Sequence, residues 1–244
     1  MKGIGGEFVE RTKYHHLGPS DQMRGVPAPD LERAFDRNED QVHLPAPGSI
    51  QVKTLDVREA VEQRKSVRSF KPLALSLDEL AYLLWCTQGV KRVLHGSVTM
   101  RTVPSAGARH ALETYLLVNR VNGLEPGMYR YLALSHRLLK LETDTRIDDQ
   151  VVAACLGQDF VKTCGVTFVW TAEAYRMTWR YGERGYRYLF LDAGHVCQNL
   201  YLSARSIGCG VCAIAAFSDD DMNRLLGLDG EERFVLYLAA AGKI

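Results

Sequence analysis

Five consecutive residues, Arg64-Lys65-Ser66-Val67-Arg68, place two guanidinium groups, an ammonium group and a hydroxyl close together in the chain. This donor set suits a dianionic phosphate, because arginine offers a planar fork of N–H groups and serine adds a neutral donor. A solvated basic turn at the end of a helix would carry the same residue types. The sequence therefore indicates either a phosphate-binding turn or an ordinary basic turn at this point.

Two segments of small residues could let a planar ligand approach the backbone closely. One is Pro104-Ser105-Ala106-Gly107, whose composition is also that of an ordinary turn. The other is Gly208-Cys209-Gly210-Val211, which leads into an apolar segment. Cys209 and Cys212 have CxxC spacing, but no second Cys or His pair stands at a matching distance. We therefore predict no metal site.

A charged and aromatic segment precedes the longest apolar pattern of the chain; it contains Tyr181, Glu183, Arg184, Tyr186 and Arg187. Charged residues are common where a helix begins, so a structural role explains this segment. The alternative is a wall that faces a substrate, with Tyr181 as a candidate catalytic group. His195, further along, is more often a satisfied core histidine than a catalyst.

One long helix pattern connects these candidate residues. Apolar residues recur at offsets of three or four, the spacing of one helix face, at Leu189, Ala193, Val196, Cys197, Leu200, Ala204 and Ile207. Other apolar residues lie off this stripe, so the helix is apolar nearly all round, which predicts burial in a large core or in a subunit interface. Gly208 is the predicted end of the helix, because glycine readily takes the positive φ common there.

The remaining patterns favour an α+β fold. Asp56 and Ser76 each stand three residues before a glutamate and predict capped helices over residues 56–64 and 76–89. Strands are predicted over 114–121, 127–131 and 136–141 as an antiparallel meander, then over 166–172 and 234–239. Further helices are predicted over 148–162 and 218–227. Because no regular βαβ repeat appears, we expect a mainly antiparallel sheet flanked by helices.

Composition excludes several classes of protein. The chain has 244 residues, 46% of them hydrophobic, enough for one sizeable core. Its net charge of +1, from 30 Lys and Arg against 29 Asp and Glu, argues against nucleic acid as a partner. Apolar runs of membrane-spanning length and a secretory signal are both missing, so we expect a soluble, cytoplasmic protein. Residues 1–54 are rich in proline and weakly periodic, which predicts an irregular N-terminal extension before a domain over 55–244.

The stretches YGERGYRY, DAGHVCQNLYLSA and IGCGVCAIAAF resemble the C-terminal signature of the nitroreductase superfamily, specifically its SagB/ThcOx-type branch. The family also has an Arg-x-Ser-x-Arg segment near the start of its domain, similar to Arg64-x-Ser66-x-Arg68, and a loop similar to residues 104–107. The three motifs stand in the family's order, and the resemblance covers about residues 56–243.

This resemblance implies a nitroreductase-like fold, with the long helix at the interface of a homodimer and FMN bound at the interface. The implied cofactor-binding residues are Arg64, Lys65, Ser66, Arg68, Pro104, Ser105, Ala106, Gly107, Gly208, Cys209, Gly210, Val211 and Lys243. The loop at 104–107 often comes from the partner subunit in this family. Lys243 stands where family members often place a basic residue near the phosphate.

The activity that the resemblance implies is hydride transfer from NAD(P)H through FMN to an electron-poor acceptor such as a nitroaromatic or a quinone. One alternative is a dehydrogenase that oxidises azolines in a peptide substrate; another is a non-catalytic scaffold of a maturation complex. Azoline-oxidising relatives have a Lys-Tyr pair thought to supply a base, whereas this chain has Arg180-Tyr181. Arginine is a poor general base, so azoline oxidation is disfavoured.

Overall fold

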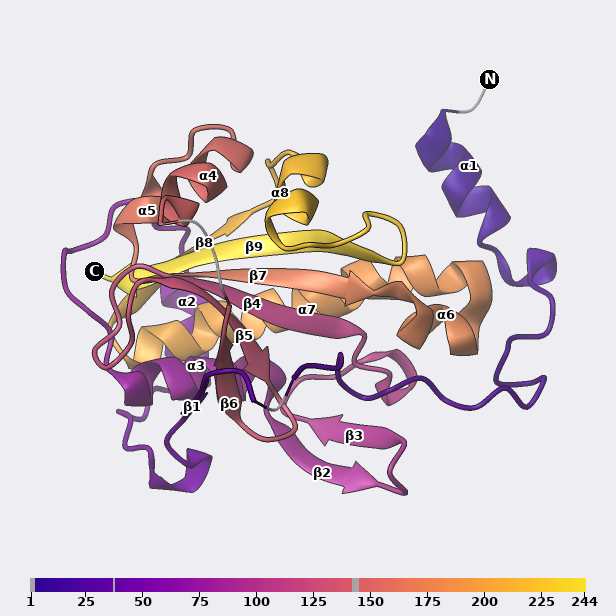
Figure 1. Ribbon diagram of the computed structural model, residues 1–244, viewed down its shortest axis with the longest axis horizontal. Coiled ribbons are helices and arrows are strands. Elements are labelled where there is room, and N and C mark those ends of the chain that lie inside the picture. Colours follow the sequence, from indigo (N-terminus) through magenta and orange to yellow (C-terminus); the bar gives the residue numbers. More distant parts are fainter. Residues whose placement is uncertain (1–2, 37, 142–144) are drawn as a thin grey trace.

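A computed structural model describes residues 3–36, 38–141 and 145–244 (Figure 1). Its centre is a seven-stranded sheet in the order β1-β6-β5-β4-β7-β9-β8. Every neighbouring pair of strands is antiparallel, which confirms the predicted sheet type. The strands are β1 Gln41–His43, β4 Leu112–Val118, β5 Gly127–Leu132, β6 Arg137–Lys140, β7 Val166–Glu173, β8 Cys209–Ile214 and β9 Arg233–Lys243.

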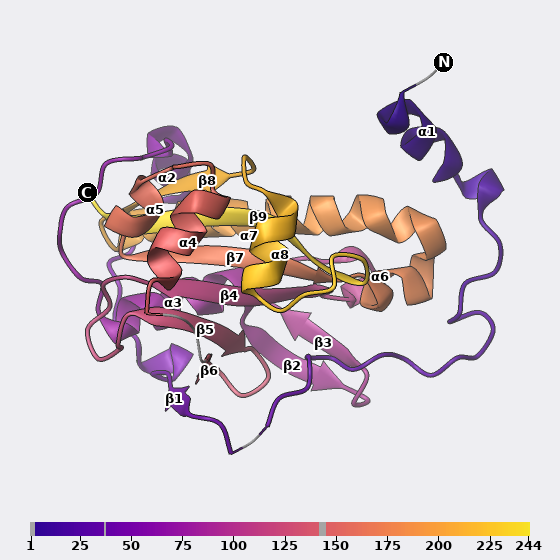
Figure 2. The same ribbon diagram turned by 45° about the horizontal axis from the view of Figure 1, so that its top comes forward.

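Helices cover both faces of this sheet (Figures 1 and 2). The α-helices are α1 Ile4–Arg11, α2 Val57–Gln63, α3 Leu77–Gln88, α4 Ile147–Ala154, α5 Phe160–Thr163, α6 Ala174–Tyr181, α7 Gly185–Ser206 and α8 Asp219–Leu225. Successive strand residues point to opposite faces. Leu116 of β4 therefore packs in the core with α3 and α7, while Leu117 packs in a second core with α4 and α8.

The local signals for α2, α3 and α7 are confirmed. The Asp56 carboxylate accepts hydrogen bonds from two backbone N–H groups of the first turn of α2, and Ser76 forms a complete capping box with Glu79. The end of α7 is followed by Gly208 with φ +66°. These signals act within a few residues, so tertiary packing does not alter them.

Two expectations are wrong in part, and some elements were not predicted. The helix predicted over 148–162 is divided into α4 and α5, because Leu156 and Gly157 have positive φ angles of 57° and 76°. Residues 209–214, expected as a turn and an apolar segment, form the edge strand β8. Helix α6 and the hairpin of β2 Val90–Leu94 and β3 Val98–Arg101 were not predicted.

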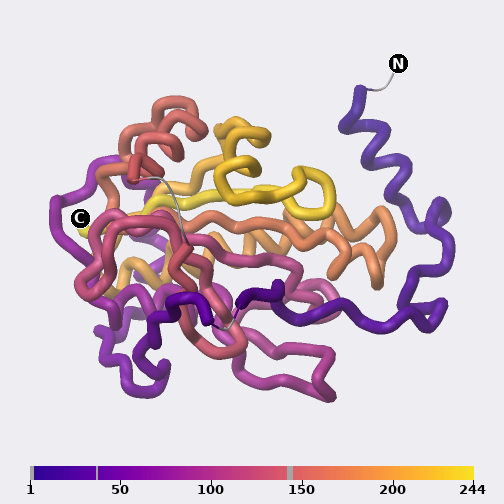
Figure 3. Tube along the Cα trace, in the orientation of Figure 1, coloured from indigo at the N-terminus to yellow at the C-terminus, as the bar shows by residue number. Residues whose placement is uncertain are grey.

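The first 54 residues contribute to the sheet and are not simply an irregular arm; two parts of this segment, residues 1–2 and residue 37, lie outside the described residues. Helix α1 stands beyond α6, and the chain then runs back across the molecule to β1 (Figure 3). Strand β1 pairs with β6, so the extension supplies one edge of the main sheet.

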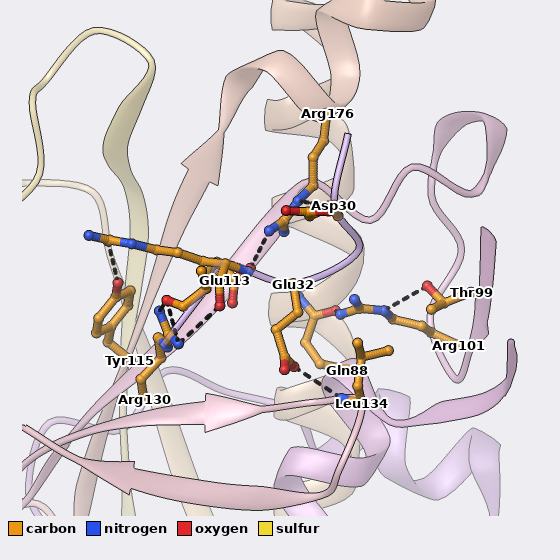
Figure 4. A network of polar contacts seen from close by, with 12 residues as sticks. Asp30, Glu32, Gln88, Thr99, Arg101, Glu113, Tyr115, Arg130, Leu134 and Arg176 are labelled. Carbon is orange, nitrogen blue, oxygen red and sulfur yellow. Dashed lines mark hydrogen bonds and ion pairs between the residues drawn. The ribbon is translucent and has the colours of Figure 1, made fainter. Parts of the chain in front are cut away.

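Buried charges fix the middle of this extension to the core (Figure 4). Glu113 and Arg176 form an ion pair of 2.6 Å with side chains only 5% and 7% exposed. The backbone N–H of Arg33 donates to Glu113 at 2.8 Å, and Arg176 Nε donates to the Asp30 carbonyl at 2.8 Å. Asp30 is therefore bound by α6 and Arg33 by β4.

The 22-residue helix α7 is the longest in the part of the chain that the structure describes. No helix among these residues is both long and apolar enough to cross a membrane. The predicted stripe from Leu189 to Ala204 is buried, whereas a second face is exposed and carries Phe190, Leu191, Gly194, His195 and Gln198. A Cβ on Gly194 would meet no atom within 4 Å, so this face of α7 is open.

Candidate functional site

The basic turn at residues 64–68 lies along the free side of β8. The N–H of Val67 donates to the carbonyl of Val211 at 2.9 Å, and Ser66 forms an isolated parallel bridge with Val211. This places Arg64, Ser66 and Arg68 beside the residues that follow α7. The structure thus brings together the first and third sequence motifs, although 140 residues separate Arg68 from Gly208.

Gly210 permits this approach. A Cβ on Gly210 would lie 2.8 Å from Val67 Cβ and 2.7 Å from Ile244 Cγ2, which is closer than side chains tolerate. The space on the Cβ side of Gly210 is therefore filled by the chain itself, and the predicted contact of residues 208–211 with a cofactor stays a prediction. Cys209 and Val211 are also buried, whereas Gly208 is exposed with open space beside it.

The turn at residues 64–68 and residues 208–211 form what we call the first half-site. Tyr201 of α7 joins these two parts, and sequence reasoning missed it. Its hydroxyl lies 3.0 Å from Ser66 Oγ and accepts a hydrogen bond from the Ala213 N–H at 2.9 Å. The Arg64 guanidinium lies over the Tyr201 ring at 5.3 Å. A tyrosine on the buried side of an apolar helix is the signal that could have identified it, because a buried hydroxyl needs a partner.

The charges of this half-site are unevenly paired. Arg64 is half-buried, and Lys65 and Arg68 are exposed; within the described ranges none of the three forms an ion pair with a carboxylate. Arg68 lies near Cys212, where its charge opposes the rise that burial causes in the pKa of the thiol. Lys243, by contrast, is paired with Glu79 and donates to the Ile207 carbonyl at 2.9 Å.

This donor set fits the phosphate end of a cofactor such as FMN. Three cations and the Ser66 hydroxyl gather at one turn, and the absence of acidic partners among the described residues leaves their positive charge available to an anion. Lys243 could contribute only after its contact with Glu79 changes, because that carboxylate now neutralises it.

The segment 104–107 forms a separate half-site near the other end of α7. The Ala106 N–H donates to Asp192 Oδ1 at 3.2 Å, and Ser105 Oγ accepts from the His110 N–H at 2.8 Å. Pro104 is exposed, and a short 3-10 helix, Ala106–Ala108, follows it. The loop is thus attached to α7 through Asp192.

Gly107 has φ +56° and lies against the end of α6. A Cβ on Gly107 would lie 2.9 Å from Arg180 Cδ and Nε and even closer to the Tyr181 hydroxyl. Tyr181, the candidate catalytic residue, also makes an edge contact with Tyr188, with ring centroids 4.8 Å apart. The structure therefore places Tyr181 beside the 104–107 loop but provides no partner, within the described ranges, that would make it a base.

Asp192 and His110 are buried ionisable residues of this half-site that sequence reasoning missed. Burial raises the pKa of Asp192, and its Oδ2 atom has no hydrogen-bond partner within the described part of the chain. Burial, with the nearby charges of Arg101 and Arg109, lowers the pKa of His110 to about 3. Asp192 could have been identified as an aspartate within a buried helix pattern, whereas no local pattern identifies His110.

The two half-sites lie apart within one chain. Asp192 and Tyr201, which mark them on α7, are nine residues apart, or about 14 Å along a helix that rises 1.5 Å per residue. The structure therefore does not gather all thirteen predicted cofactor residues around one point of a single chain.

The fold is that of a class of α+β oxidoreductases. The model of the nitroreductase family matches residues 61–243, and the chain belongs to this family. The candidate nitroreductase MJ1384 of Methanocaldococcus jannaschii is 32% identical over 204 residues, which cover 84% of this chain and 98% of that protein. The predicted resemblance is thereby confirmed.

Peptide-processing proteins are also among the relatives. The trifolitoxin-processing protein TfxB of Rhizobium leguminosarum is 32% identical over 166 residues, 65% of this chain, and this chain spans 44% of TfxB. A chain of the E. coli microcin synthetase complex McbBCD has a similar fold, with a TM-score of 0.61, 21% identity and coverage of 99% of this chain and 92% of that one.

Proposed function

We propose that the protein is an FMN-dependent oxidoreductase that passes hydride from NAD(P)H to an electron-poor acceptor such as a nitroaromatic or a quinone. The observation that carries this proposal is the turn of Arg64, Ser66 and Arg68 against β8, with cations that lack carboxylate partners in the described ranges. Bound FMN would supply a flavin ring that accepts a hydride and releases it to an acceptor. Membership of the nitroreductase family supports the assignment.

In this proposal each part of the chain has a separate task. Arg64, Lys65 and Arg68 neutralise the phosphate, and Ser66 donates a hydrogen bond to it. Lys243 adds a further positive charge once Glu79 releases it. Residues 208–211 hold the turn in place, with the exposed Gly208 nearest to solvent.

We further propose that the site is completed by a second copy of the chain. The loop of Pro104, Ser105, Ala106 and Gly107 contacts α7 about 14 Å from Tyr201, too far to meet the basic turn of its own chain. The exposed face of α7, with Phe190 57% and Leu191 59% exposed, is a surface that a C2 partner would cover with the same face. In such a dimer, residues 55–244 of each copy form the cofactor-binding unit.

A second candidate function is oxidation of azolines in a peptide. The similarity to the trifolitoxin-processing protein TfxB favours it. Against it stands Arg180, because arginine is a poor general base. A third candidate, a non-catalytic scaffold within a maturation complex, would leave the unpaired cations at 64–68 without an evident role.

Visible absorption of the purified protein tests the main proposal. We expect flavin bands without added cofactor, or after addition of FMN, and prompt anaerobic bleaching by NADH or NADPH. Bands that do not bleach would favour the peptide dehydrogenase or, where a partner protein co-purifies and no acceptor is reduced, the scaffold. A protein that binds no FMN would refute the proposal.

A matched pair of variants tests the phosphate assignment. We expect Arg68→Gln to weaken FMN binding about tenfold, because it removes a charged contact with a dianion. Arg58→Gln, an exposed arginine of α2 that is paired with Glu62, serves as the control and should leave FMN affinity unchanged. Equal FMN dissociation constants for the two variants would exclude Arg68 from the site.

A further inference from the structure

Four arginines surround the 104–107 loop and the entry to α7, and they differ in how their charge is used. They are Arg109, Arg180, Arg184 and Arg187. None of them forms an ion pair with a carboxylate among the residues that the structure describes. Their other contacts show which of them is available to a ligand.

Arg184 and Arg187 hold the N-terminal arm. Arg184 Nη1 donates to the Thr12 carbonyl at 2.8 Å and its Nε to the Tyr188 hydroxyl at 2.7 Å. Arg187 donates to Thr12 Oγ1 at 2.5 Å and to the Val9 carbonyl. Because these carbonyls lie at the end of α1, both arginines have a structural task.

Arg109 is buried and also has structural partners. Its guanidinium lies over the Trp179 ring at 5.1 Å and donates to the Ser97 carbonyl at 3.3 Å. Burial lowers the pKa of Arg109, and the positive charge of Arg180 lowers it further. The two positive charges therefore repel each other.

Arg180 is the exception, because among the described residues its guanidinium has only an aromatic ring as a partner. The side chain is exposed, and its guanidinium lies 5.5 Å from the centre of the Tyr181 ring. Its side chain lies against Gly107, and a Cβ on residue 107 would lie only 2.9 Å from Arg180 Cδ and Nε. An uncompensated charge is thus held over the loop that faces the cofactor in the proposed function.

We propose that Arg180 binds an anionic group of the molecule that reacts at this site, either a carboxylate on the acceptor or a phosphate of the nicotinamide donor. The location of the reaction rests on the proposed function, whereas the unpaired charge beside Arg109 does not. An anion here would relieve the repulsion between the two guanidiniums. The planar fork of Arg180 suits two-point binding of a carboxylate or phosphate, and Tyr181 would contact an aromatic part of the ligand.

Isothermal titration of the purified full-length protein tests this assignment with three ligands that do not turn over in the absence of a reductant. They are 4-nitrobenzoate, the neutral nitrobenzene and NADP⁺. The variants are Arg180→Gln, which removes the charge, and Arg180→Lys, which keeps it. Arg224→Gln, an exposed arginine of α8 on the opposite side of the sheet, is the control.

We expect Arg180→Gln to weaken binding of 4-nitrobenzoate, of NADP⁺ or of both at least fivefold, and to change that of nitrobenzene less than twofold. Arg180→Lys should recover part of the loss. A loss restricted to 4-nitrobenzoate identifies the acceptor carboxylate as the anion, and one restricted to NADP⁺ identifies the donor phosphate. Equal changes for all three ligands, or none, would overturn the assignment.

The same samples separate this inference from the proposed function. Their visible spectra report bound flavin independently of the titrations. A protein without flavin refutes the FMN proposal, yet a charge-selective loss in Arg180→Gln would still establish the anion site. A protein with flavin and no charge-selective loss keeps the FMN proposal and refutes the role of Arg180.

Discussion

Gly107 is a residue whose identity is required by both its backbone and its neighbours. Its φ of +56° disfavours any side chain, and Arg180 and Tyr181 occupy the space where a Cβ would lie. The loop at 104–107 and the end of α6 can pack together only because no side chain separates them.

We expect Gly107→Ala to lower the free energy of unfolding by about 2 kcal/mol, part from the positive φ and part from the clash. Gly96→Ala is the matched control, because Gly96 has φ +65° with no atom within 4 Å of a Cβ. Urea unfolding of both variants measures the difference. A loss no larger at 107 than at 96 would show that the contact with Arg180 and Tyr181 is easily displaced.

His110 makes the stability of the folded protein depend on pH in the acid range. Burial holds its pKa near 3, well below the ordinary value of 6.5, so the folded state favours the neutral imidazole. The contribution of His110 to the free energy of unfolding is fully present above the pKa of the imidazole in the unfolded chain. It is lost as the pH falls toward 3, because the unfolded chain binds the proton more readily.

His110→Asn should therefore reduce the loss of stability between pH 7.5 and pH 4.5. Asparagine tolerates the positive φ of 45° at this position. His95→Asn is the control, since His95 is exposed and has a similar φ of 50°. Urea midpoints at the two pH values measure the effect, and an unchanged pH dependence in His110→Asn would contradict it.

At the scale of elements, the sequence predicted those helices and strands that are determined by residues close together in the chain. Capping residues and a glycine stop predicted ends of α2, α3 and α7, and runs of strand-forming residues, with a turn signal between the first two, predicted β4 to β7. Strand β8 was not recognised because Gly210 and Ala213 have weak strand preference, and pairing with Lys243 and Val67 determines its conformation. Helix α6 has no side-chain cap and buries Arg176, so its pattern was weak.

The site could be predicted only as separate motifs. A phosphate-binding role of Arg64, Ser66 and Arg68 is predicted from residue type and from the family resemblance. The contact of Ser66 with Tyr201, by contrast, joins positions 135 residues apart. The contact between Gly107 and Arg180 likewise joins distant parts of the chain. Such pairs depend on the packing of whole elements, which no short pattern contains.

The exposed face of α7 leads to a prediction about assembly. We expect Leu191→Arg to raise the dissociation constant of the proposed dimer at least tenfold, because it places a charge in an apolar interface. Leu134→Arg, at a loop residue that is 42% exposed, is the control. Sedimentation equilibrium measures the mass, and flavin content should fall with the dimer. A dimer unaffected by Leu191→Arg would exclude this face.

At the scale of the whole molecule, the buried pair of Glu113 and Arg176 connects the sheet, α6 and the N-terminal extension. We expect Glu113→Gln to lower the free energy of unfolding by about 3 kcal/mol, because it leaves the buried Arg176 without its partner. Glu125→Gln removes an exposed partner of Lys140 and should cost less than about 1 kcal/mol. Urea unfolding distinguishes the two.

A loss in Glu113→Gln no greater than in Glu125→Gln would mean that water reaches Arg176 readily. Limited proteolysis gives an independent measure, since cleavage within residues 17–40 should accelerate in Glu113→Gln only. A matched rate in both variants would show that the extension is held by other contacts, such as the pairing of β1 with β6.

The attachment of the extension also determines when it can dock during synthesis. Arg176 donates to the Asp30 carbonyl but is made 146 residues after it. At roughly 5–20 residues per second, this interval is on the order of ten seconds. Asp30 and its neighbours therefore cannot dock until α6 has been made, and until then chaperones and proteases can reach them.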